Sequence, residues 1–169
     1  MQTQLQELLD KKACEELLIR YGRTLDWLDT AGQAQCFWPD AAIDYGFFRG
    51  SATEWVPVVM ELEKASLHRW HACNSIIVQV AGSTAKSECY GLTAGSSETE
   101  KGALECHVFG GRYLDEFEKR NGLWRIAKRT YIADWAYTFP NGLDDMIKGG
   151  FLLNVWNIQV SDHPSYQCM

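Results

Sequence analysis

The chain has 169 residues, the size of one ordinary domain, and its 46% hydrophobic and 22% charged residues are typical of a folded globular protein. Acidic residues outnumber basic ones by 22 to 16, which disfavours nucleic acid as a partner because phosphate binding needs a basic surface. No apolar run approaches the roughly 20 residues of a membrane span, and no signal peptide is visible. The 6 cysteines lack C-x-x-C spacing and indicate reduced thiols, so we expect a cytoplasmic protein that binds no membrane.

Helical periodicity dominates the first part of the chain. Apolar residues recur at spacings of three and four between residues 5 and 28, which predicts an amphipathic helix. A shorter helix is predicted from Thr30, as its N-cap, to about Phe37, and the proline of Trp38-Pro39-Asp40 should end it.

A short strand is predicted over residues 43–47. Ser51 and Glu54 then have the spacing of a capping box, and the apolar run that follows them predicts a third helix.

From residue 69 onward the hydrophobic period changes to two, which is typical of strands. The predicted strands span residues 70–80, 86–93, 104–119 and 123–135. Residues 81–83 and the Asn121-Gly122 pair are turn signals, and residues 95–102 are expected to form a loop. Helices followed by consecutive antiparallel strands predict an α+β fold, whose long twisted sheet would wrap around the helices and leave a cone-shaped cavity.

Asp26 and His71 are candidates for proton-transfer chemistry. Asp26 lies at the edge of the apolar face of the first helix, where a carboxylate needs a partner. Strict alternation places His71 on one face of its strand with Cys73, Ser75, Ile77 and Gln79. A carboxylate that accepts one imidazole N–H makes the other ring nitrogen a better base. The pattern alone leaves open the ordinary alternative, a surface histidine and an aspartate in water or paired with Arg23.

Two tyrosines and two further histidines are the other candidate site residues. Tyr21 and Tyr45 are candidate hydrogen-bond donors to a substrate oxygen, or core residues with a wetted hydroxyl. His68 and His71 form H-x-x-H, but no third ligand stands at a standard spacing, so we expect neither a metal nor a cofactor. His107 lies in mid-strand and is equally compatible with a pocket wall and with the core.

Several segments, taken in their order and spacing, resemble the SnoaL-like family of the nuclear-transport-factor-like superfamily. They are Leu18–Asp26, Phe37–Ala41, Trp70–Asn74, Gly111–Phe117, Asn121–Ile126, Arg129–Trp135 and Asp162–Tyr166. The resemblance implies a cone-shaped α+β barrel, with a curved antiparallel sheet wrapped around the N-terminal helices and an internal apolar pocket. It also implies one domain over residues 1–169, with a core cone at 1–136 and an extension at 137–169 that covers the pocket or a subunit interface.

The branches that look closest are scytalone dehydratase, bile-acid dehydratase and hexachlorocyclohexane dehydrochlorinase. These enzymes pair an aspartate on the first helix with a histidine on the first long strand, and the matching positions here are Asp26 and His71. The second histidine and the asparagine of scytalone dehydratase have no clear counterparts, since Ser96 or Ser97 and Tyr113 stand in their place. Scytalone itself is therefore not the expected substrate.

The resemblance implies a cofactor-independent lyase of the dehydratase type, acting on a small cyclic apolar substrate such as a polyketide, steroid or terpenoid. His71 would abstract a proton, Asp26 would orient it, and Tyr21 or Tyr45 would polarise a substrate oxygen. The aromatic and imidazole side chains expected to line the pocket are Trp38, Phe47, Trp55, His107, Phe109 and Trp135.

Two other functions remain open at this point. One is a non-catalytic module of the same fold that binds a small ligand or serves assembly, and the other is an isomerase, cyclase or hydrolase that uses the same pocket. In each case we expect a homo-oligomer, a trimer or a dimer.

Overall fold

The computed structural model describes residues 2–156 and 159–166. In chain order its elements are α1 (Gln2–Asp26), α2 (Thr30–Gln35), β1 (Phe37–Asp44), β2 (Arg49–Ser51), α3 (Ala52–Lys64), β3 (His68–Ala81), β4 (Thr84–Glu98), β5 (Leu104–Arg120), β6 (Leu123–Pro140) and α4 (Leu143–Lys148). Among the described residues no helix is both long and apolar enough to cross a membrane.

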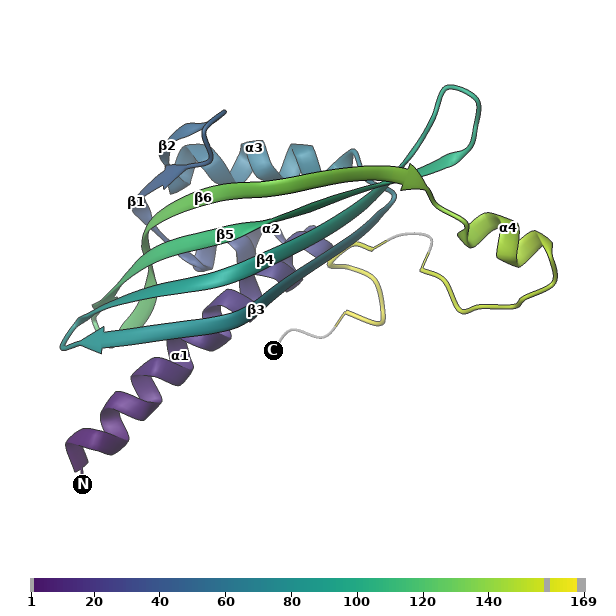
Figure 1. The fold of residues 1–169 in the computed structure, drawn as a ribbon. Helices are drawn as coiled ribbons and strands as arrows, with labels where there is room; N and C mark the ends of the chain where they lie inside the picture. The colour runs from purple at the N-terminus through teal and green to yellow at the C-terminus, as the bar shows by residue number, and fades with distance from the viewer. Residues whose placement is uncertain (1, 157–158, 167–169) are drawn as a thin grey trace.

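The strands form one curved sheet in the order β2-β1-β6-β5-β4-β3, and α1, α2 and α3 lie against one of its faces (Figure 1). We call the face toward these helices the inner face and the other the outer face. The hairpin end is the end with the β3–β4 and β5–β6 turns, and the loop end carries the β4–β5 connection, residues 99–103. This architecture confirms the α+β class, with one correction: β1 runs parallel to β6, so the sheet is mixed.

Local signals in the sequence account for two of the connections. Ser51 accepts from the backbone N–H of Glu54, and the Glu54 carboxylate accepts from the backbone N–H of Ser51, so the predicted capping box starts α3. Asn121 and Gly122 both have positive φ, 51° and 81°, which matches the twist of a tight hairpin between β5 and β6.

Some predicted boundaries were wrong. Asp29 and not Thr30 caps α2, through a 2.8 Å hydrogen bond from the Gly32 N–H to the Asp29 carboxylate. β1 begins at Phe37 and includes Pro39, which the sequence predicted as a helix stop. Pro39 lies where the β1–β6 register shifts, so its missing N–H disrupts no ladder bond. β4 extends into the predicted loop 95–102, because residues 95–98 pair with β5 and residues 95 and 96 also pair with β3.

A β-bulge in β3 overturns the predicted alternation. Ser75 has a φ of 49°, and the pairing with β4 shifts between Asn74 and Ile77. The extra residue reverses the inward and outward alternation of the side chains that follow it. Val78 and not Ile77 therefore lies on the inner face with His71.

The core below the helices contains a buried ion pair. Arg129 on β6 binds Asp115 on β5 with two hydrogen bonds of 2.7 and 2.8 Å, and neither side chain is exposed. The guanidinium lies 4.0 Å from the Tyr21 ring centre and 4.3 Å from that of Tyr113, within cation–π distance of both. The charge is therefore neutralised by a carboxylate and enclosed by aromatic rings.

We expect Asp115→Ala to lower the free energy of unfolding by about 3–5 kcal/mol, because it leaves a buried guanidinium without its counter-ion. The neighbouring Glu116 pairs with Lys128 across the same two strands on the exposed outer face, which makes Glu116→Ala a matched control with a cost of about 1 kcal/mol or less. Urea unfolding of both variants measures the difference, and equal costs would contradict the role given to the buried pair.

Candidate active site

Asp26 and His71 form a close pair at the loop end of the inner face. The His71 Nδ1 lies 2.7 Å from one Asp26 carboxylate oxygen, and the backbone N–H of His71 donates to the other at 3.3 Å. Asp26 is the last residue of α1, and Gly22, one turn earlier, passes directly over His71. A Cβ at position 22 would lie 3.2 Å from the His71 Cβ, so glycine allows the helix to approach the strand closely.

Glu63 is a third member of the site, and the sequence analysis missed it. It lies in the last turn of α3, with a carboxylate oxygen 3.4 Å from the His71 Nε2. The imidazole therefore stands between two carboxylates, one at each ring nitrogen. The side chains of His71, Asp26 and Glu63 are 8%, 15% and 18% exposed, so the site is largely but not fully withdrawn from solvent.

These contacts change the protonation of His71. Burial lowers the pKa of the imidazole, but the hydrogen bonds and charges of Asp26 and Glu63 outweigh it and raise the pKa to about 9. At neutral pH the histidine of the free protein is therefore an imidazolium with a carboxylate on each side.

Arg69 fixes the backbone around this group. Its guanidinium donates to the carbonyl of Asp26 at 3.1 Å, of Ser66 at 2.6 Å and of Glu63 at 3.3 Å, and also to the carbonyl of Gln159. The C-terminal ends of α1 and α3 are thus held by one buried cation, which is the charge that helix C-termini favour. Asp26 and Glu63 are held on opposite sides of His71 as a result.

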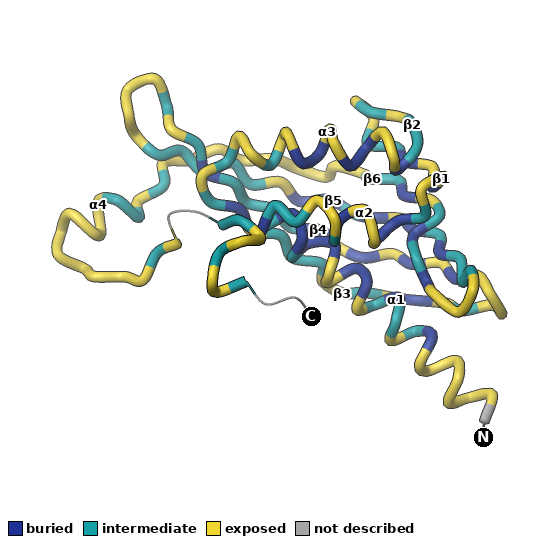
Figure 2. Tube along the Cα trace, turned by 180° about the vertical axis from the view of Figure 1, so that it is seen from behind, coloured by how far each residue is buried: buried dark blue, intermediate teal, exposed yellow. Residues whose placement is uncertain are grey.

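Part of the C-terminal extension packs beside the site. Trp27, which directly follows Asp26, contacts the rings of Trp156, His163 and Tyr166. The Tyr166 hydroxyl donates to Asp29. Residues 157, 158 and 167–169 of the predicted extension lie outside the described residues. The described part covers the end of α1, while the stretch from Leu143 to Trp156 is mostly exposed (Figure 2).

Tyr21 and Tyr45 lie deeper in the core. Their hydroxyl oxygens are 2.7 Å apart, and the Tyr45 ring stacks on Trp55 at 4.2 Å. Burial raises the pKa of Tyr45 to about 12, so at neutral pH these phenols are hydrogen-bond donors and not bases. Trp55, predicted as a pocket wall, is a fully buried core residue beneath them.

Three other predicted pocket walls lie away from the dyad. Trp38 is at the hairpin end, where its indole N–H donates to the Glu118 carbonyl. Phe47 is 71% exposed in the β1–β2 turn. Trp135 lies on the outer face, because a register shift between Gly110 and Gly111 moves it to the side opposite to His71.

The remaining two, Phe109 and His107, lie on the inner face near the dyad. Phe109 on β5 pairs with Thr93 on β4, and Thr93 pairs with His71 on β3, so the three residues lie in one row across the sheet. His107 lies in the next row, with ring nitrogens 3.0 Å from the Ser97 hydroxyl and 3.1 Å from that of Thr138.

The helices leave this part of the inner face uncovered. Phe109 is 46% exposed, and every residue of β6 from Ile132 to Pro140 is exposed (Figure 2). The dyad thus borders an open surface that carries an aromatic ring and a few hydroxyl and imidazole groups, the mixture that small-molecule sites use.

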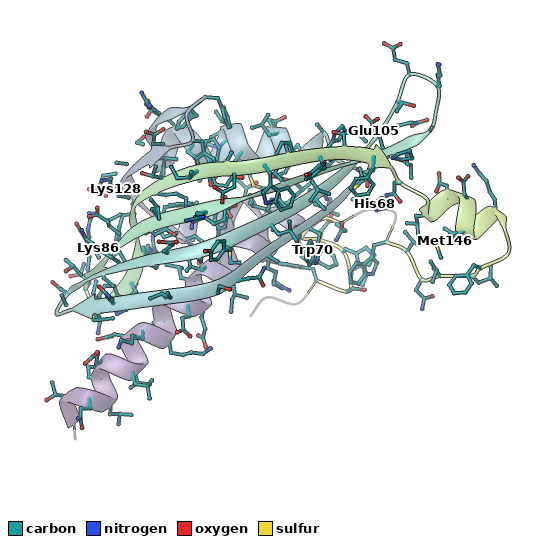
Figure 3. All side chains as sticks on the ribbon, viewed as in Figure 1. His68, Trp70, Lys86, Glu105, Lys128 and Met146 are labelled. Atoms are coloured by element: carbon teal, nitrogen blue, oxygen red, sulfur yellow. The ribbon has the colours of Figure 1, made fainter. Side chains whose placement is uncertain are left out.

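Two pockets of the molecule lie elsewhere. One of about 560 Å³ is at the hairpin end, and its lining includes Lys86 and Lys128 (Figure 3). Glu116 and Phe117 line it as well. The other, about 220 Å³, lies between α2, β1 and α3. None of the predicted site residues lines either of them.

A metal site is not formed by the predicted histidines. His68 and His71 are three residues apart on β3 and point to opposite faces of the sheet. In the described part of the chain, no group of three or more His, Cys, Asp or Glu residues is arranged to hold a metal ion.

Solved structures with the same fold include enzymes. A protein from Novosphingobium aromaticivorans, assigned provisionally as a scytalone dehydratase, superposes with a TM-score of 0.69 at 18% identity, over 77% of this chain and 87% of its own. A hexachlorocyclohexane dehydrochlorinase (LinA, type 2) gives a TM-score of 0.67 at 18% identity, over 82% and 93% of the two chains. A nuclear transport factor 2-like superfamily protein from Salmonella enterica gives 0.64 at 17% identity, over 74% and 91%.

At the sequence level, no curated protein matches the chain. The model of the SnoaL-like domain matches residues 6–130, which contain most of α1 and of the sheet, together with Asp26, Glu63 and His71. The chain therefore belongs to the SnoaL-like family, within the fold of the nuclear-transport-factor-like superfamily.

Proposed function

We propose that the protein is a lyase that eliminates water from a small cyclic apolar substrate without a cofactor, with Asp26 and His71 at its centre. The observation that carries the proposal is the 2.7 Å contact between the two side chains beside an uncovered inner sheet face. A binding or assembly module would not need a carboxylate on a histidine nitrogen at this place.

The chemistry of the pair follows from its geometry. Asp26 accepts the Nδ1–H and thereby directs the Nε2 of His71 away from α1. In the neutral imidazole, Nε2 would take a proton from a carbon next to a carbonyl group, and Asp26 would stabilise the imidazolium that forms. A positioned base of this kind contributes about 10²- to 10⁴-fold in rate.

Tyr21 and Tyr45 have a secondary role in this proposal. Before either tyrosine can donate to a substrate oxygen, the 2.7 Å hydrogen bond between the two hydroxyl groups must break. Their contribution is therefore smaller than that of the dyad, and Tyr45→Phe should slow the reaction less than loss of His71.

Substitution of the dyad tests the function. With a panel of cyclic β-hydroxy ketones, the wild type should release water and form the unsaturated ketone, and His71→Ala and Asp26→Asn should lower kcat by about 10²- to 10⁴-fold. His68→Gln, on the opposite face of the same strand, is the matched control and should stay within about twofold of the wild type. Binding of these ketones without turnover by the wild type would instead support a binding module.

We further propose that the protein associates with copies of itself through the outer face. Large apolar side chains lie exposed together on the outer face, and such a patch is typical of an interaction surface. This outer apolar patch consists of Trp70, Tyr90, Leu114, Ile132, Trp135 and Tyr137.

Sedimentation equilibrium tests this association. Ile132→Glu places a charge in the outer apolar patch and should shift the dimer or trimer toward monomer. Leu123→Glu, which changes a more exposed residue at the start of β6, away from the patch, should leave the mass unchanged. A wild type that sediments as a monomer at all concentrations would refute the proposal.

A further inference from the structure

We propose that Glu63 is a second catalytic group of this site, the acid that protonates the departing oxygen while His71 removes the proton from carbon. This inference rests on the proposed function and adds a residue to it. In the resting site, the nitrogen that should act as the base, Nε2 of His71, faces the Glu63 carboxylate.

The position of Glu63 is unusual for a carboxylate. It lies in the last turn of α3, where the helix dipole disfavours a negative charge, and Asp26 lies at the corresponding end of α1. Each carboxylate thus has its negative charge stabilised by His71, and Arg69 stabilises the carbonyl groups of both helix ends. An apolar ligand that excludes water from the site would penalise the two separate charges of His71 and Glu63.

The two carboxylates hold the imidazole differently. One Asp26 oxygen lies 2.7 Å from the His71 Nδ1, and the other accepts from the His71 backbone N–H. Glu63 has one oxygen 3.4 Å from the His71 Nε2, which is longer than a charge-assisted hydrogen bond. Glu63 is also the more exposed of the two. It is therefore the partner that can move aside, so that a substrate carbon reaches Nε2 and its leaving oxygen reaches the glutamate.

The protons balance over one cycle. On substrate binding the Nε2 proton passes to Glu63, which leaves a neutral imidazole and a neutral carboxylic acid. His71 then takes the proton from carbon, the C–H electron pair forms the C=C bond, and the C–O bond breaks as Glu63 gives its proton to the oxygen. Water leaves, and the imidazolium and the carboxylate of the resting site are restored.

Other charged groups around His71 do not take this role. Asp26 from α1 is bound to Nδ1, on the far side of the ring. From β3 itself, Arg69 is a permanent cation bonded to carbonyl groups, and Cys73 is the next residue on the same face. The neighbouring position on β4 is Thr93, which does not titrate in this range.

The pH profile separates an acid from a structural residue. In the wild type, kcat/KM for a hydroxyl substrate should fall above about pH 9, because the pair of Glu63 and His71 then loses the single proton that it shares. In Glu63→Gln only a neutral His71 is needed, so kcat/KM should rise with pH to a plateau. The NMR titration of His71 in this variant should give a pKa at least about one unit below that of the wild type.

The leaving group provides the second test. With the hydroxyl substrate, Glu63→Gln should lower kcat by about 10²- to 10⁴-fold, whereas a β-chloro analogue of the same ketone, whose chloride departs without a proton, should stay within about tenfold. Glu61→Gln is the matched control, since Glu61 lies on the same helix and pairs with the exposed Lys64, and it should change neither rate nor profile.

The outcomes distinguish this inference from the function on which it rests. Equal losses on both leaving groups in Glu63→Gln, an unchanged fall above about pH 9, or an unshifted pKa of His71 would overturn the role of Glu63 and leave the dyad in place. A wild type that turns over neither substrate would overturn the proposed function and, with it, the acid.

Discussion

The close approach of α1 to β3 determines the rest of the site. Gly22 lets the helix backbone lie against His71, and one turn later the chain reaches Asp26, on the same side of the helix. A larger side chain at position 22 would press on the His71 Cβ and backbone carbonyl and move the carboxylate away from the ring. The pairing therefore follows from a packing contact between a helix and a strand, and not from an isolated attraction between two charges.

Charge compensation then explains why polar groups are tolerated on the inner face. Toward the hairpin end, Arg129 is neutralised by Asp115 and enclosed by tyrosine rings, and it is fully buried. At the loop end, His71 is neutralised by Asp26 and Glu63, and there the inner face is open. The first pair has no room to react and stabilises the fold, whereas the second borders a surface that a ligand can reach. The two charged groups thus differ in their access to solvent, although both are neutralised by carboxylates.

Sequence reasoning predicted the first three helices, the capping box and the β5–β6 hairpin, because each depends on residues close in the chain. It did not predict α4. The pairing of Asp26 with His71 depended on the resemblance to a family, since periodicity placed both residues only roughly. Glu63 was missed because it stands among the charged residues of a helix end, where a glutamate looks like ordinary surface charge. Its contact with His71 appears only once α3 and β3 are placed together.

Register shifts explain why some side chains lie on the face of the sheet opposite to the predicted one. A non-glycine residue, Ser75, adopts positive φ and makes a bulge that no turn signal announces. A second shift near Gly110 moves Trp135 to the outer face, although simple alternation from Arg129 would put it inside. Aromatic residues occur in the core, in the β1–β2 turn and on both faces, so their presence alone could not identify a pocket wall.

Because His71 is held as an imidazolium between two carboxylates, the stability of the protein should depend on pH. A histidine whose pKa is raised from 6.5 to about 9 on folding contributes stability that is complete below about pH 6.5 and is lost as the pH rises through 9. Urea unfolding of the wild type and of His71→Gln between pH 6 and 10 isolates this contribution. We expect the stability advantage of the wild type over His71→Gln to fall across that range. An advantage that is constant, or that grows as the pH rises, would contradict it.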